Sequence, residues 1–193
     1  MKKQIHNFWS LNADEALVAS WLKEKLKSDY EVFFPANSQF PYVDLIVFNS
    51  KNKKTTTVQV KSSQSYLVKY ENEEYWASGH DIQLDKIEPD KVDFFIFTCY
   101  YPEKTKKKAE SPRDITKYFV VFQTSKLKDY VMKVKEPKLI KSKRIPFSFY
   151  IHPSDGKLYE DWGLKEPYKK SDEPMLALRD TFDNYDIIKK MLQ

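Results

Sequence analysis

The sequence has few glycines, a single cysteine and no long apolar run. Only 3 glycines occur among 193 residues, which argues against a glycine-rich phosphate-binding loop. The lone Cys99 excludes an internal disulfide and a multi-cysteine zinc site, and its place in the apolar run 94–99 predicts a buried, unreactive thiol. No segment approaches the ~20 apolar residues of a membrane span, and the first residues, Met-Lys-Lys, lead into a mixed segment that does not resemble a signal peptide. The sequence therefore predicts a cytoplasmic protein.

Aromatic and basic residues, in contrast, are abundant. Aromatic residues make up 16% of the chain, and 33 Lys and Arg outnumber 28 Asp and Glu, for a net charge of +5. Such a charge suits a polyanionic partner such as nucleic acid. Lysines are concentrated in 51–54, 104–108 and 133–144. Each cluster is equally compatible with a solvated surface, so charge alone leaves both interpretations open.

The hydrophobic pattern predicts a single α/β domain, residues 1–193, with a mixed central β-sheet flanked by helices. Helices are expected over 12–27, from a cap at Thr124 or Ser125 to residue 132, and over 172–192 as the closing helix. Strands are expected over 31–34, 43–49, 55–61, 92–99 and 117–123, with an outer hairpin of 140–144 and 147–151. The stretches 62–89 and 100–114 show no clear period and are expected to be irregular.

Three polar residues interrupt two of the apolar strands. Asp44 lies near the start of one strand, and Gln59 and Lys61 lie at the end of the next. Because side chains alternate along a strand, Gln59 and Lys61 point to the same face, and the hairpin brings Asp44 beside them. Burying these groups costs several kcal/mol unless they pair or bind a metal. The pattern predicts a functional site here, while a structural Asp44–Lys61 pair stays open as an alternative.

Asp44 on one strand, followed by Gln59-Val60-Lys61 on the next, resembles the signature of the PD-(D/E)xK nuclease superfamily in its Q-x-K variant. Pro41 lies near the position of the family proline, and Glu15 lies where many members carry a glutamate on the first helix. The motifs fall within residues 12–64. The resemblance implies a restriction-endonuclease-like fold.

The resemblance also implies a role for each residue of the motif. Asp44, Gln59 through its amide oxygen, Val60 through its backbone carbonyl and Glu15 would bind Mg²⁺ or Mn²⁺. Lys61 would activate the attacking water or stabilise charge on the phosphorane, so Asp44, Gln59, Lys61 and Glu15 are the candidate catalytic residues. Because Gln59 replaces an acid, one metal ion is favoured over two.

Each of these roles has a structural alternative. Glu15 stands three residues after Asn12, so a capping box explains it as well. Gln59 could be a hydrogen-bonded core amide, and Lys61 could be a surface lysine at a strand end. The three histidines have no metal-ligand spacing and are expected in loops or on the surface.

Polar and basic residues after the motif are candidates for contacts with nucleic acid. The aromatic residues between Tyr66 and Trp76 could stack on bases or pack against the sheet. The candidate contact residues are Ser62, Ser63, Gln64, Lys69, Lys106 and Lys107.

The sequence thus favours a Mg²⁺-dependent DNA endonuclease of the restriction or defence type, acting as a homodimer by analogy with the family. RNA stays open as a substrate. The alternative is a nucleic-acid-binding or protein-interaction module on the same fold that has lost catalysis, because Gln59 departs from the commoner acid.

Overall fold

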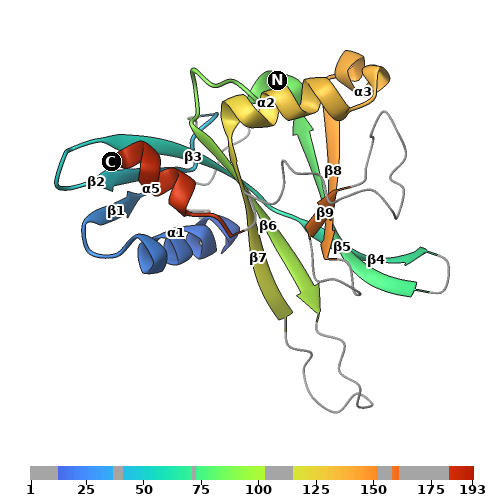
Figure 1. Cartoon of the computed structure of the whole chain (residues 1–193), viewed down its shortest axis with the longest axis horizontal. Helices are drawn as coiled ribbons and strands as arrows, with labels where there is room; N and C mark the ends of the chain where they lie inside the picture. Colours follow the sequence, from blue (N-terminus) through green and yellow to red (C-terminus); the bar gives the residue numbers. More distant parts are fainter. Residues whose placement is uncertain (1–12, 37–40, 71–72, 103–114, 152–157, 161–182) are drawn as a thin grey trace, which may run out of the picture.

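The computed structural model describes residues 13–36, 41–70, 73–102, 115–151, 158–160 and 183–193, which form two β-sheets around shared hydrophobic cores (Figure 1). In the five-stranded sheet, β3 and β6 pair in parallel and all other neighbours pair antiparallel. Its strands, in spatial order, are β1 (Tyr30–Phe33), β2 (Leu45–Asn49), β3 (Thr55–Lys61), β6 (Phe94–Pro102) and β7 (Ile115–Gln123).

The second sheet is antiparallel and has four strands among the described residues. In spatial order they are β4 (Gln64–Tyr70), β5 (Glu73–Gln83), β8 (Arg144–Ile151) and β9 (Leu158–Glu160). The helices described are α1 (Ala13–Leu26), α2 (Thr124–Val134), α3 (Pro137–Ser142) and α5 (Asp186–Leu192), with a 3₁₀ turn, η1 (Leu84–Lys86), after β5.

Helices α1 and α5 cover one face of the five-stranded sheet (Figure 1). On α1, Val18 and Leu22 are fully buried four residues apart, which is the helical spacing of a core-facing stripe. They pack with Leu45, Val58 and other apolar side chains from the same face of the sheet. The amphipathic pattern read from the sequence therefore gives the position of this helix.

The four-stranded sheet and α2 cover the opposite face. Alternate residues of β6, Phe95 and Phe97, point to this side and pack with Phe147 and Phe149 of β8 and with Leu127 of α2. Several of these rings lie within contact distance, such as Phe97 and Phe149 with centroids 5.1 Å apart. A mixed α/β fold is confirmed, but one face of the central sheet is flanked by a second sheet as well as by helix.

The structure confirms the first helix, the hairpin of β2 and β3, and the apolar strands β6 and β7. Three predictions were wrong. Residues 62–89 contain β4 and β5 and are not irregular, and 137–142 form helix α3 where an outer hairpin was expected. Helix α2 starts from Gln123 without a side-chain cap, because Thr124 is buried in the first turn and donates its backbone N–H to Asp93 O at 2.8 Å.

The closing helix is shorter than predicted. Within 183–193 it spans only Asp186–Leu192, and residues 172–182 lie outside the described part of the chain. Asp183 has a left-handed backbone, φ 46°, that a helix cannot continue through. It exchanges hydrogen bonds with Phe119: the Asp183 N–H donates to the carbonyl at 2.7 Å, and its carboxylate accepts the Phe119 N–H at 2.8 Å. This tether to β7 fixes where α5 begins.

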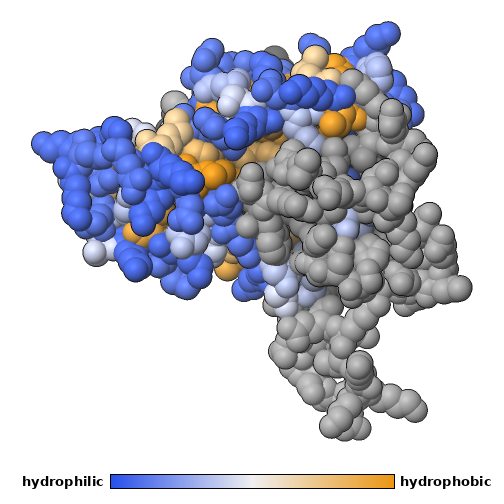
Figure 2. Space-filling model, viewed as in Figure 1, coloured by the Kyte–Doolittle hydropathy of each residue, from blue (hydrophilic) through white to orange (hydrophobic). Residues whose placement is uncertain are grey.

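The described surface seen in Figure 2 is mainly hydrophilic over α2 and around the β1–β2 end of the molecule. Large apolar side chains are exposed at Met132 and Met191 and at the consecutive residues Phe33 and Phe34. Within the described residues, no helix has the length and apolar character needed to cross a membrane.

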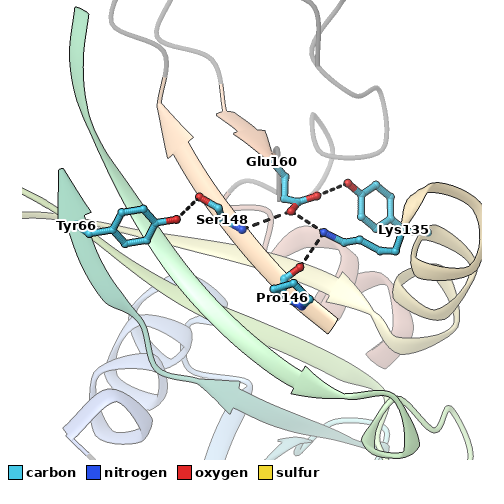
Figure 3. A network of polar contacts seen from close by, with 6 residues as sticks. Tyr66, Lys135, Pro146, Ser148 and Glu160 are labelled. Carbon is cyan, nitrogen blue, oxygen red and sulfur yellow. Dashed lines mark hydrogen bonds and ion pairs between the residues drawn. The ribbon is translucent and has the colours of Figure 1, made fainter. Parts of the chain in front are cut away.

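A buried ion pair joins α2 to the four-stranded sheet (Figure 3). Lys135 Nζ and Glu160 Oε1 are 2.6 Å apart, and both side chains are fully buried. Lys135 also donates to Pro146 O at 2.9 Å, while Tyr130 donates its hydroxyl to Glu160 Oε2 at 2.7 Å. Burial raises the pKa of Glu160, and Lys135 is the strongest influence that opposes the rise. The charge of each partner is therefore compensated by the other inside the protein.

His80 on β5 is buried, 7% exposed, and does not lie on the surface as predicted. Its ring packs edge-on against Phe97 and Phe149, with centroids 5.0 and 5.6 Å away, and its Nε2 is 3.9 Å from the Cys99 sulfur. Burial lowers the pKa of His80 to about 3 and raises that of Cys99 to about 12. Cys99 is thus the buried, unreactive thiol that the sequence predicted.

The low pKa of His80 predicts a loss of stability in acid. The unfolded state binds a proton below about pH 6.5, whereas the folded state does not until about pH 3. Stability should therefore fall as the pH drops, by about 2 kcal/mol from this residue between pH 7 and pH 5. Urea unfolding of the wild type and His80→Phe at both pH values measures it. An equal pH dependence in both proteins would contradict the assignment.

Candidate functional site

The predicted site lies where the hairpin of β2 and β3 opens. Asp44 precedes β2, and its N–H donates to Val58 O at 2.9 Å. The register pairs Leu45 with Val58, so Asp44 lies opposite Gln59 on the neighbouring strand. Leu45 and Val58 pack towards α1 and α5, and Asp44 and Gln59 consequently point to the other face. Lys61 shares that face with Gln59, two residues further along β3.

The carboxylate of Asp44 is fixed by the backbone of the next strand. Its Oδ2 accepts the Val60 N–H at 2.7 Å, so the side chain binds an amide at the point where the β2–β3 ladder ends. Burial raises the pKa of Asp44, while the Val60 N–H and the charge of Lys61 lower it. The half-buried Asp44 carboxylate is thus held in one orientation by the neighbouring strand.

Gln59 has a buried oxygen without a partner. Its side chain is 6% exposed, and among the described residues its Oε1 accepts no hydrogen bond. Buried polar atoms are nearly always hydrogen-bonded, and an unmet one costs roughly 1–3 kcal/mol. Gln59 also lines a cavity of about 560 Å³ together with Lys61. The described residues therefore do not support the alternative in which Gln59 is a hydrogen-bonded core amide.

Lys61 is half-buried and close to several charges. Burial lowers its pKa, Asp44 and, more weakly, Glu15 raise it, and Lys86 lowers it. Lys61 and Asp44 influence each other electrostatically but form no ion pair among the described residues. The described residues therefore show no Asp44–Lys61 ion pair of the kind that the sequence left open, and burial is the main cause of the lowered pKa of Lys61.

Glu15 lies in the first turn of α1 and is half-buried. The helix packs on the opposite face of the sheet, yet the carboxylate is close enough to raise the pKa of Lys61. Its neighbour Asp14 accepts a hydrogen bond from the Tyr100 hydroxyl on β6. Asn12, the partner in the alternative capping box, lies outside the described residues. Glu15 is therefore near the site, at the end of the strands.

Two cations at the cavity were not singled out from the sequence. Lys86 of η1 and Arg144 of β8 line it with Gln59 and Lys61, as does Asp81 of β5. Lys86 lies in the stretch 62–89, which was predicted to be irregular. Arg144 was predicted to end the first strand of an outer hairpin, whereas it begins β8. The sequence feature that pointed to Arg144 as a contact for a polyanion was the basic cluster 133–144, which ends at this residue.

The other predicted contact residues are placed only in part. Ser62 is exposed directly after Lys61, and Ser63 is half-buried with an Oγ that has no hydrogen bond among the described residues. Gln64 and Lys69 belong to β4, an outer strand of the four-stranded sheet, but their side chains lie outside the description. Lys106 and Lys107 fall wholly outside the described residues.

The oxygen donors that lie opposite each other on the hairpin are the Asp44 carboxylate and the Gln59 amide, and the Glu15 carboxylate lies near them. In the described part of the chain, no group of three or more His, Cys, Asp and Glu side chains is arranged to hold a metal ion. The unpartnered Gln59 oxygen opposite Asp44 nevertheless fits a hard cation such as Mg²⁺, which binds oxygen and keeps several waters. Comparison with protein-family models, curated proteins and solved structures gives no match.

Proposed function

We propose that the chain is a metal-dependent nuclease that hydrolyses phosphodiester bonds, resembling the PD-(D/E)xK superfamily and acting on DNA. The observation that carries the proposal is that Gln59 Oε1, buried and without a hydrogen bond among the described residues, lies on the strand opposite the half-buried Asp44. A core built for stability alone would hydrogen-bond this amide or replace it with an apolar residue. Lys61, with its lowered pKa, lies beside both.

Each residue then has a defined task. Asp44 and Gln59, with Glu15 and the Val60 carbonyl as further donors, would hold one Mg²⁺ or Mn²⁺ ion. When bound, the ion supplies Lewis-acid stabilisation of the developing phosphorane charge. The Val60 N–H orients the Asp44 carboxylate. Lys61 accepts the proton of the attacking water, or, when protonated, donates hydrogen bonds to the phosphate oxygens.

Cleavage of a substrate panel tests the proposal. Supercoiled, linear duplex and single-stranded DNA and RNA are incubated with Mg²⁺, Mn²⁺ or EDTA, using the wild type and Asp44→Asn. We expect cleavage only with a divalent cation and only by the wild type. Binding of nucleic acid in EDTA without cleavage under any condition would instead support the alternative, a binding module on the same fold.

Gln59→Glu tests whether Gln59 is a ligand. Replacing the amide by a carboxylate adds a full negative charge beside the cation, so the variant should bind Mn²⁺ more tightly than the wild type. Isothermal titration calorimetry at neutral pH measures the change, with Gln83→Glu as a matched control in the same cavity. Equal tightening in both variants would indicate a general charge effect, and weaker binding in Gln59→Glu would remove Gln59 from the metal site.

A further inference from the structure

A second cavity continues the candidate site along β5 and β8. Asp81 and Arg144 line both this cavity, of about 520 Å³, and the cavity that contains Gln59 and Lys61. Ser62, which directly follows Lys61, lies on the wall of the second cavity. The two cavities share Asp81 and Arg144 as lining residues, and together they are called here the β5–β8 groove.

Arg144 is held at this junction by an exposed ion pair. Its Nη2 and Nε donate to Asp81 Oδ2 at 2.6 and 3.0 Å across the β5–β8 pair. The side chains are 75% and 45% exposed, and exposed ion pairs contribute little stability. The planar guanidinium matches a phosphate group through paired N–H donors. Asp81 thus positions Arg144 in the groove without preventing an anion from binding it.

A second cation, Lys86, also lines the first cavity. Lys86 Nζ is 4.7 Å from the centroid of the Tyr42 ring, and Lys91 Nζ is 4.4 Å from the same ring. Lys91 also donates to the Tyr42 hydroxyl at 3.1 Å. Among the residues that line the first cavity, three are cations, Lys61, Lys86 and Arg144, and one is an acid, Asp81. This excess of positive charge fits a polyanion.

We infer that one strand of nucleic acid lies along the β5–β8 groove, with Lys86 and Arg144 binding the phosphates next to the one at Lys61. The inference rests on the proposed function for the phosphate at Lys61 itself. Asp81 holds Arg144 at the groove but, as an acid, also opposes the binding of phosphate, so an amide at this position keeps an acceptor for Arg144 and removes the repulsion. The strand is bound through its phosphodiester backbone, so affinity depends on salt and little on sequence.

Binding without catalysis tests this inference. Fluorescence anisotropy of labelled single-stranded DNA, duplex DNA and RNA is measured in EDTA over a range of salt, with Arg144→Ala, Lys86→Ala and Asp81→Asn. Lys138→Ala is the control, since Lys138 is an exposed cation in an ion pair with Glu136 on α3. Loss of one phosphate contact should reduce the salt slope by about 0.9 on duplex and about 0.7 on single strands. Arg144→Ala and Lys86→Ala should show this reduction, and Asp81→Asn should bind several-fold more tightly.

The outcomes separate this inference from the proposed function. Reduced salt slopes in Arg144→Ala and Lys86→Ala support binding in the groove. If the protein shows these slopes but cleaves no substrate, only the nuclease proposal is wrong. Slopes equal to that of Lys138→Ala in a protein that still cleaves overturn the groove alone. A wild type that binds no nucleic acid overturns both. Thermal melting shows whether each variant is folded. If a mononucleotide displaces the labelled nucleic acid as strongly as an oligonucleotide does, the groove binds a single nucleotide and not a strand.

Discussion

Lys61→Ala should lower the rate of phosphodiester cleavage about 10²- to 10⁴-fold, the usual contribution of a general acid or base. Burial lowers the pKa of this half-buried lysine, as it raises the pKa of the neighbouring Asp44. Single-turnover cleavage with Mn²⁺ measures the loss. Lys117→Ala, an exposed lysine on β7, is the matched control and should cleave like the wild type.

Lys61→Arg separates the two roles open to this residue. If Lys61 accepts a proton, the wild-type rate rises with pH as the lysine loses its charge, and Arg, which stays protonated, does not restore cleavage. If Lys61 acts only as a cation, Arg restores much of the rate. Full activity in Lys61→Ala would remove the residue from the mechanism.

Lys135→Met should lower the free energy of unfolding by about 3–5 kcal/mol, because it leaves Glu160 buried without its counter-charge. The double variant Lys135→Met/Glu160→Gln removes both charges and should recover most of the loss, since an amide oxygen can still accept the Tyr130 hydroxyl. Urea unfolding at pH 7 compares the three proteins. Equal destabilisation in the single and double variants would mean that packing, and not charge, sets the effect.

The same pair gives a pH test. Without Lys135 the pKa of Glu160 rises further above its unfolded value, because the strongest influence lowering it is gone. A raised folded pKa adds stability that is present in acid and is lost as the pH increases. The difference between Lys135→Met and wild type should therefore shrink from pH 8 to pH 5. A constant difference would contradict the electrostatic explanation.

The sequence predicted the shared face of Asp44, Gln59 and Lys61, and there is a physical reason for this. Asp44 comes just before the apolar run 45–48, and Gln59 and Lys61 alternate with valines at the end of a β-branched strand, so the pattern shows both the strands and their polar exceptions. The alternation of side chains along a strand then gives the shared face without further information. This alternation does not indicate the chemical roles of Asp44, Gln59 and Lys61, which stay predictions.

The four-stranded sheet was missed because its core-facing positions are partly polar. On β5, Ser78 and His80 occupy buried positions beside Ile82, so the apolar alternation that indicates a strand is absent. Helix α3 ends at Lys143 in a left-handed conformation, φ 59°. Glycine or asparagine usually marks that position, and lysine gives no such signal. Tertiary packing, and not the local sequence pattern, therefore determines the conformation of β5 and of α3.

Manganese-induced broadening of NMR signals tests the central claim most directly. Mn²⁺ broadens resonances of nuclei close to it, so a titration locates the ion without requiring cleavage. We expect the Val60 amide and the Gln59 side-chain amide to broaden first in the wild type, and to stay sharp in Asp44→Asn at the same Mn²⁺ concentration. Broadening centred elsewhere in the chain, or unchanged by Asp44→Asn, would contradict a metal site formed by Asp44 and Gln59.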